Sequence, residues 1–167
     1  MKTTWLGCAV LGCLSVALAG QTPQQQAEMQ HHHSCLQEEQ ASIERGEGFG
    51  MAMPADRAGY PGPRHVLDMG ADLKLTTDQR TAMEKLYNGM KEKALVRGKE
   101  LFEAEGRLEQ MFREGRTEAD LREQSFRIDS IHAELRWIHL SAHLAAQKLL
   151  TPEQIAAYTR LRHAQMM

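Results

Sequence analysis

Two long amphipathic stretches limit this chain to a helical fold more strongly than any other feature. In residues 77–114 and 117–149, apolar side chains recur at seven-residue multiples and are joined by a second series three or four residues on. Such heptad patterns are typical of helices that pack lengthwise against each other. We therefore predict an all-α fold built on a long antiparallel helical hairpin. The first stretch carries Met83, Met90, Ala104 and Met111 with Tyr87, Ala94, Leu101 and Leu108, and the second carries Leu121, Ile128, Leu135, Ala142 and Leu149 with Ile131, Ile138 and Ala145.

Capping motifs indicate where the helices begin and end. Leu75-Thr76-Thr77-Asp78-Gln79 and Leu150-Thr151-Pro152-Glu153-Gln154 each place a threonine three residues before a glutamine, which is the spacing of a capping box. Thr117-Glu118-Ala119-Asp120 predicts a third helix start, and Gly115 suits the stop of the helix before it. Short helices near 65–73 and over 152–165 are expected to flank the hairpin.

Several residues interrupt the heptad pattern. Arg97 and Gln124 fall within the apolar seams of the two stretches. Gly89, Gly98 and Gly106 lie inside the first stretch, where each costs roughly 1 kcal/mol relative to alanine. The hairpin is therefore expected to be long and only moderately stable.

Leu95 and Phe102 lie about 100° around the first helix from its seam, so part of the outer face is also apolar. Packing by the end helices explains this strip. The alternative is that the strip forms a dimer interface or a surface for client proteins.

The first nineteen residues predict export. Lys2 precedes an apolar run from Trp5 to Leu18, and Ala17-Leu18-Ala19 has the A-x-A form of a cleavage site. The run is shorter and more interrupted than the roughly 20 apolar residues of a membrane span. We expect a cleavable signal peptide over 1–19, no transmembrane anchor in the mature form and a periplasmic location, with lipidation at Cys13 as the minor alternative.

Residues 20–64 differ in composition from the rest of the mature chain. They are rich in Gln, Gly, Met and Pro, which predicts a flexible, disordered N-terminal tail and linker before a helical domain over 65–167. With the signal peptide removed, Cys35 is the one cysteine left. In an oxidising compartment it is free, pairs between chains or binds metal.

Composition and motifs exclude several classes of protein. The formal net charge of −2 provides no net basic field for a nucleic-acid backbone. Aromatic residues make up only 5% of the chain, which disfavours a β-sandwich or barrel. The sequence contains no Gly-rich phosphate loop, G-x-S-x-G elbow or H-E-x-x-H motif, so we predict that the protein is not an enzyme.

Histidines provide candidate metal ligands in three places. His139 and His143 are spaced so that they point the same way from one helix, and His65 and Met69 have the same spacing in the first short helix. His31-His32-His33-Ser34-Cys35 forms a third group in the tail. Each group also has a plain interpretation, as boundary histidines packed beside the core or as a polar, solvated tail.

The paired Leu-Thr-x-x-Gln motifs, which bracket a helical hairpin behind an export signal, resemble the Spy/CpxP superfamily. The resemblance covers about 65–165 and includes the approach to the second motif at 139–149. This superfamily includes periplasmic chaperones and the CnrX- and ZraP-type metal-responsive proteins. The resemblance implies a curved helical dimer without enzymatic activity, which holds clients, regulates envelope stress or senses nickel, cobalt, zinc or copper.

Metal-sensing relatives of this type hold an ion between the first helix and the last part of the hairpin, with a carboxylate between. Carried over to this sequence, the ligands would be His65, Met69, His139 and His143, with Glu84 as the carboxylate. Such donors suit Ni, Co, Cu or Zn rather than calcium. We expect a periplasmic metal-binding, metal-responsive protein of the heavy-metal-resistance type. The alternative is a chaperone or envelope-stress regulator, and the expected partners are a second copy, an envelope signalling protein or unfolded client proteins.

Overall fold

A computed structural model describes Gln24, Ser34 and residues 37–166 of the chain, without the side chains of residues 163, 165 and 166. The expected signal peptide, Cys13, the three tail histidines and Cys35 lie outside the described residues. No helix in the described part of the chain has both the length and the hydropathy needed to cross a membrane.

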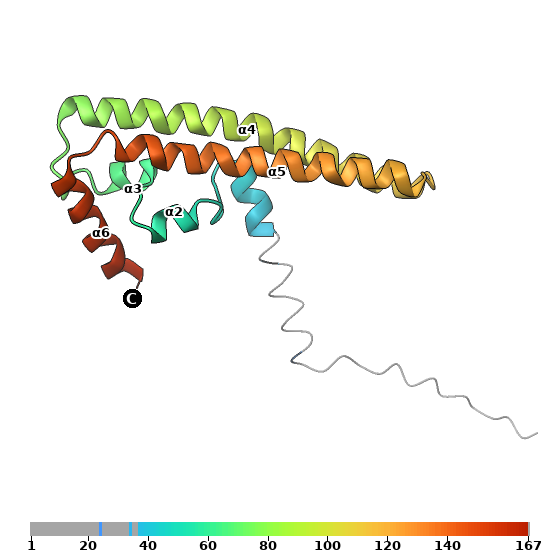
Figure 1. The fold of residues 1–167 in the computed structure, drawn as a ribbon, viewed down its shortest axis with the longest axis horizontal. Coiled ribbons are helices and arrows are strands. Elements are labelled where there is room, and N and C mark those ends of the chain that lie inside the picture. Colours follow the sequence, from blue (N-terminus) through green and yellow to red (C-terminus); the bar gives the residue numbers. More distant parts are fainter. Residues whose placement is uncertain (1–23, 25–33, 35–36, 167) are drawn as a thin grey trace, which may run out of the picture. The chain divides into compact units, whose positions relative to one another are not determined.

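Two long helices form the centre of the fold, α4 (Thr77–Arg113) and α5 (Glu118–Gln147). They run antiparallel along each other, which confirms the predicted all-helical hairpin (Figure 1). Gly115 ends α4 with a φ of 65°, and the N–H of Arg116 donates to the carbonyl of Met111 at 3.1 Å, as in a Schellman motif. Thr117 then caps α5 through the predicted capping box with Asp120.

Most of the predicted seam lies between the two helices. The residues that interrupt it find polar partners: the Gln124 side-chain amide donates to the Ala104 carbonyl at 2.7 Å, and Arg97 forms an ion pair with Glu134 of the facing helix at 2.8 Å. Because both groups are partnered, they do not break the packing. The buried core of this part comprises Ile43, Ala94, Leu101, Ala104, Ile128, Ile131 and Leu135.

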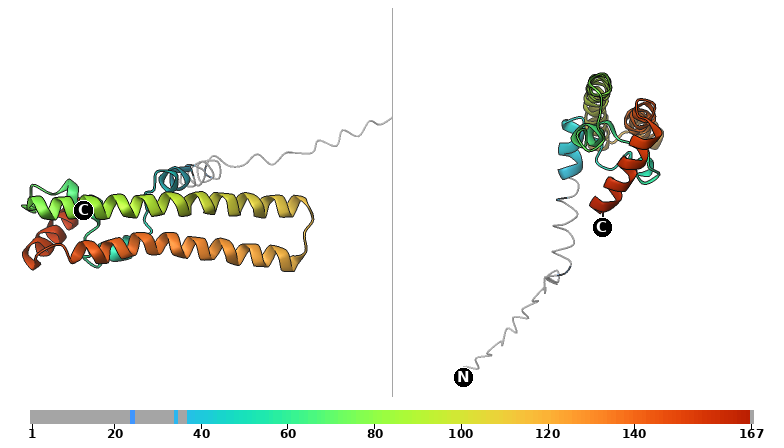
Figure 2. Two further views of the ribbon diagram at one scale, coloured as in Figure 1. Left: turned by 90° about the horizontal axis from the view of Figure 1, so that it is seen from above. Right: turned by 90° about the vertical axis from the view of Figure 1, so that its left-hand side faces the viewer.

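The open end of the hairpin is closed by two short helices, α3 (Pro63–Asp68) and α6 (Pro152–Met166) (Figure 2). The flanking helices were expected at 65–73 and 152–165; α3 ends earlier because the chain turns over Met69–Lys74, where Lys74 has a φ of 49°. A second apolar cluster fills the space between these helices and the hairpin. Its buried members are Val66, Met69, Leu73, Met83, Ala146, Leu150 and Tyr158.

The two Leu-Thr-x-x-Gln motifs meet at this end. Each glutamine accepts a hydrogen bond from the backbone N–H of its own threonine, Thr76 at 3.1 Å and Thr151 at 2.9 Å. Each also donates from its amide to the opposite segment: Gln79 to the Leu149 carbonyl, and Gln154 to the Leu73 carbonyl. Both predicted capping boxes are therefore present, and the two motifs hold each other.

Residues 37–62 follow a more ordered course than their linker-like composition suggests. Residues 37–44 are helical, and a short helix α2 (Met53–Arg57) follows a series of turns. Ile43 packs so closely on α4 that a Cβ on Gly98 would lie 2.7 Å from its Cγ2. Leu95 stays partly exposed and Phe102 is half-buried against the same cluster, so residues near Ile43, rather than the end helices, cover part of this apolar strip.

Candidate functional site

A cleft of about 540 Å³ lies where the segment before α3 meets α5 and α6. Its walls combine glycine-rich backbone with charged and aromatic side chains. Three histidines line it: His65 comes from α3, and His139 and His143 come from successive turns of α5. The remaining lining is formed by Gly46, Glu47, Gly48, Phe49, Gly50, Ala52, Met53, Asp56, Gly62, Pro63, Arg64, Asp68, Tyr87, Met90 and Arg162.

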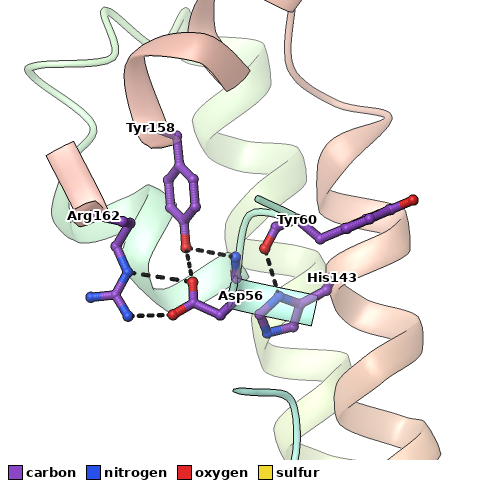
Figure 3. Close-up of polar contacts among 6 residues, drawn as sticks. Asp56, Tyr60, His143, Tyr158 and Arg162 are labelled. Atoms are coloured by element: carbon purple, nitrogen blue, oxygen red, sulfur yellow. Dashed lines mark hydrogen bonds and ion pairs between the residues drawn. The ribbon is translucent and has the colours of Figure 1, made fainter. Parts of the chain in front are cut away.

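His143 is held in place by the backbone of the segment opposite. Its Nδ1 lies 2.9 Å from the carbonyl oxygen of Tyr60, and its side chain is nearly buried (Figure 3). Because a carbonyl only accepts hydrogen bonds, Nδ1 carries the proton and donates it. In the neutral ring, Nε2 is then left with its lone pair, and that nitrogen is available as a ligand.

Gly62 leaves open a point that two of the histidines face. A Cβ at this position would lie 3.0 Å from His143 Cε1, 3.1 Å from His143 Nε2 and 3.4 Å from His65 Nδ1. The φ of Gly62 is −80°, so its backbone conformation suits any residue, and the close approach of the two rings is what favours glycine. Two imidazole nitrogens from different helices thus lie beside the same small space.

Two of the histidine nitrogens have no hydrogen-bond partner. His65 Nδ1 and His139 Nε2 are both buried and unpaired within the described part of the chain. Burial lowers the pKa of His139, and the neighbouring His143 lowers it further. Burial likewise lowers the pKa of His65, with the Arg162 guanidinium adding to the effect and Asp56 opposing it. Both rings are therefore neutral at pH 7, the form in which imidazole binds metal ions.

The His139 ring packs against the backbone turn that carries Gly48. A Cβ on Gly48 would lie 3.0 Å from His139 Nδ1, so this glycine permits the backbone to lie directly over the ring. His139 is only 4% exposed as a result. Its Nε2 has no hydrogen-bond partner among the described residues.

A buried polar cluster fixes the segment that carries Gly62. The Tyr158 hydroxyl of α6 donates to Asp56 Oδ1 at 2.7 Å and accepts from the N–H of Gly62 at 3.2 Å (Figure 3). Arg162 forms an ion pair with Asp56 Oδ2 at 2.5 Å. Burial of Asp56 acts to raise its pKa, but the hydrogen bonds from Arg162 and Tyr158 outweigh it, so the pKa of Asp56 is lowered. The carboxylate is charged and ties α2 to α6.

The structure brings together three of the five ligands suggested by the family resemblance. Met69 lies outside the cleft, buried in the apolar cluster with Val66 and Leu73. It is the C-cap residue of α3, and its N–H donates to the His65 carbonyl at 3.0 Å, so the predicted spacing is present in the backbone although the Met69 side chain packs in the core and not in the cleft. Glu84 is exposed on α4 and does not line the cleft. No group of three or more His, Cys, Asp or Glu side chains among the described residues is arranged to hold a metal ion.

Sequence reasoning did not find the polar residues that position the site. Asp56, Tyr158 and Arg162 carry no motif, and Gly62 sits in a stretch whose Pro and Gly content is typical of linkers. The one available signal was the Tyr-Pro-Gly-Pro run at 60–63, because rigid and flexible residues side by side favour a defined turn.

Comparisons with protein-family models, with curated proteins and with solved structures find no match for this chain.

Proposed function

We propose that the protein is a periplasmic metal-binding, metal-responsive protein that acts without catalysis. The observation that carries the proposal is the pair of nitrogens, His65 Nδ1 and His143 Nε2, which lie 3.4 Å and 3.1 Å from the point that a Cβ on Gly62 would occupy. Imidazole suits Ni, Co, Cu and Zn ions. The donation from His143 Nδ1 to the Tyr60 carbonyl is the second contact that orients metal-binding histidines in proteins.

The response depends on which elements carry the two ligands. His65 lies on α3, and His143 lies on α5. An ion bound by both would join the short helix and the segment before it to the hairpin, and water would fill its other coordination positions. The ion would bind more tightly when α3 is docked on the hairpin than when α3 is detached, because only the docked state brings both ligands together. Ion binding then shifts the equilibrium toward the docked state. A partner that reads the position of this segment would sense the metal.

Isothermal titration with Ni, Co, Cu and Zn at pH 7.5 tests the proposal. The full chain is used, with His31, His32 and His33 changed to Asn and Cys35 to Ser, so that the tail does not bind the ions. His143→Gln and His65→Gln should each weaken binding at least about tenfold. His132→Gln is the matched control, because His132 is also on α5 but does not line the cleft. Equal affinity in all three variants would overturn the site.

Gly62→Ala provides a second test of the same site. The new Cβ would occupy the point between the two rings, and the backbone conformation imposes no strain of its own. Metal binding should therefore be lost in a chain that still shows full helical circular dichroism. Unchanged affinity in Gly62→Ala would mean that any bound ion lies elsewhere.

A further inference from the structure

The donors that line the cleft include sulfur as well as nitrogen. Met90 of α4 and Met53 of α2 line it together with His65, His139 and His143. Neither methionine belongs to one of the two apolar clusters of the fold. Core packing therefore does not account for their presence at this position.

Met90 lies level with the histidines of α5. Arg97 of α4 pairs with Glu134 of α5 at 2.8 Å, and this contact fixes the register of the two antiparallel helices. Met90 is seven residues before Arg97, so it faces the part of α5 about seven residues after Glu134, which lies between His139 and His143. The thioether and the two imidazoles thus come from facing turns of the hairpin.

The Met90 side chain has room to turn into the cleft. It also lines a second hollow, of about 740 Å³, whose wall on α5 includes the small side chains of Ser141, Ala142 and Ala145. Met90 is accordingly half-buried rather than enclosed. Because methionine is unbranched and flexible, its sulfur can reach the histidines without a change in the backbone.

The carboxylates of the cleft are engaged by arginines. Each of the three carboxylates that line it forms an ion pair. The pairs are Asp56 with Arg162, Glu47 with Arg45 and Asp68 with Arg64. By contrast, His65 Nδ1 and His139 Nε2 are buried and have no hydrogen-bond partner within the described part of the chain. The donors left for a bound ion are imidazole nitrogen and thioether sulfur.

Sulfur donors discriminate between the ions that imidazole alone accepts. Imidazole suits Zn, Ni and Cu alike, whereas thioethers select the soft ion Cu(I). We propose that the cleft is selective for Cu(I), with Met90 as the thioether ligand beside His65 and His143. This selectivity rests on the proposed function, because it keeps the two imidazoles as ligands and adds a third donor from α4.

Isothermal titration with Ag⁺ and with Zn²⁺ at pH 7.5, in a chloride-free buffer, tests this selectivity. Ag⁺ is the probe for Cu(I), because it is a soft monovalent ion that keeps its oxidation state in air. The full chain is used, with the three tail histidines changed to Asn and its cysteines, Cys8, Cys13 and Cys35, changed to Ser, so that these residues do not bind silver. In Met90→Leu the affinity for Ag⁺ should fall at least about tenfold, while the affinity for Zn²⁺ stays within about twofold.

Two further methionines on the page serve as comparisons. Met111→Leu is the matched control, because Met111 is also on α4 but is buried outside the cleft, and it should change neither affinity. Met53 is 46% exposed, so Met53→Leu should weaken Ag⁺ binding less than Met90→Leu does. Competition with a coloured Cu(I) chelator, under argon and with ascorbate, should rank the variants in the same order for Cu(I) itself. Circular dichroism of each variant shows whether the hairpin remains folded.

Different results would overturn Cu(I) selectivity and metal binding as such. If His65→Gln and His143→Gln weaken Zn²⁺ binding but Met90→Leu leaves Ag⁺ binding unchanged, Met90 is not a ligand, and the histidine site stands without it. If Met53→Leu lowers the Ag⁺ affinity and Met90→Leu does not, the sulfur ligand comes from α2 and the assignment of Met90 is wrong. If both histidine variants bind both ions as tightly as the parent chain, the proposed function itself fails.

Discussion

Gln79 and Gln154 pair through their side-chain amides across the open end of the hairpin. Gln79 Nε2 lies 2.8 Å from Gln154 Oε1, and Gln154 Nε2 lies 3.0 Å from Gln79 Oε1. Each oxygen also accepts from the N–H of its own capping threonine. The pair therefore joins two helix starts that are 75 residues apart in the sequence.

Loss of one member of this pair should destabilise the fold more than the loss of a capping contact. Gln79→Met keeps the length of the side chain but leaves the Leu149 carbonyl and the Thr76 N–H without these partners, and it removes one of the two hydrogen bonds that the Gln154 amide donates. We expect the free energy of unfolding to fall by about 1–3 kcal/mol, the cost of partly buried groups left unpaired. Urea denaturation at pH 7.5 measures it.

The third capping box supplies the control. Asp120→Ala removes a side chain that caps its own threonine, Thr117, and forms an exposed ion pair with Arg116, so it should cost less than about 1 kcal/mol. In a double-mutant cycle, Gln79→Met and Gln154→Met should show a coupling of at least about 0.5 kcal/mol. Additive losses would show that the amide pair contributes nothing beyond two independent caps.

The three glycines inside α4 should respond differently to alanine. Gly89 and Gly106 have no neighbouring atom within 4 Å of an added Cβ, so Gly106→Ala should raise the free energy of unfolding by about 1 kcal/mol. Gly98→Ala would place its Cβ 2.7 Å from Cγ2 of Ile43, so it should lower the free energy of unfolding. Urea denaturation compares the two, and stabilisation by Gly98→Ala would contradict the close packing of Ile43 on α4.

Local patterns predicted the hairpin well because its causes are local. The heptad series and the capping boxes at Thr76, Thr117 and Thr151 depend on residues within one or two helical turns of each other. The pairing of Gln79 with Gln154 was not predicted, since it depends on how far α5 extends before α6 begins. Only the tertiary structure sets that distance.

The candidate site was predicted in part for the same reason. The spacing of His139 and His143 on one helix was sufficient to place both in one cleft. The same spacing did not place Met69 in the cleft with His65, because the Met69 side chain is buried in the apolar cluster with Val66 and Leu73. The segment around Gly62 has a linker's composition, and its order depends on a hydrogen bond to Tyr158, which is 96 residues away.

Removal of the Tyr158 hydroxyl should release the segment before α3. In Tyr158→Phe, Asp56 and the N–H of Gly62 each lose a buried partner, so we expect a loss of about 1–3 kcal/mol in the free energy of unfolding. Tyr87→Phe is the matched control, because the one hydrogen bond of the Tyr87 hydroxyl among the described residues is with the exposed Arg64, at 3.3 Å. Urea denaturation measures the free energy of unfolding of both variants. Equal losses in Tyr158→Phe and Tyr87→Phe would show that the buried cluster does not stabilise the fold.

Stability should fall as the pH drops below the ordinary pKa of histidine. His65 and His139 have lowered pKa values in the folded chain, so below about pH 6.5 the unfolded chain binds protons that the folded chain does not. The free energy of unfolding must then decrease with decreasing pH until the folded pKa values are reached. Asp56 does not contribute in this range, because its lowered pKa affects stability only below its ordinary value of 3.8.

Urea denaturation between pH 7.5 and 5.0 measures this slope. The groups that face the two rings are Asp56, Asp68, Arg162 and His143, and His139→Gln leaves all four in place. We expect a shallower slope in His139→Gln, because that variant lacks one of the two rings whose pKa is lowered in the folded chain. The reasoning fails if wild-type stability is constant over this range, because the two buried rings would then take up protons in the folded chain as readily as in the unfolded one. Such a result would mean that the cleft around them admits water freely.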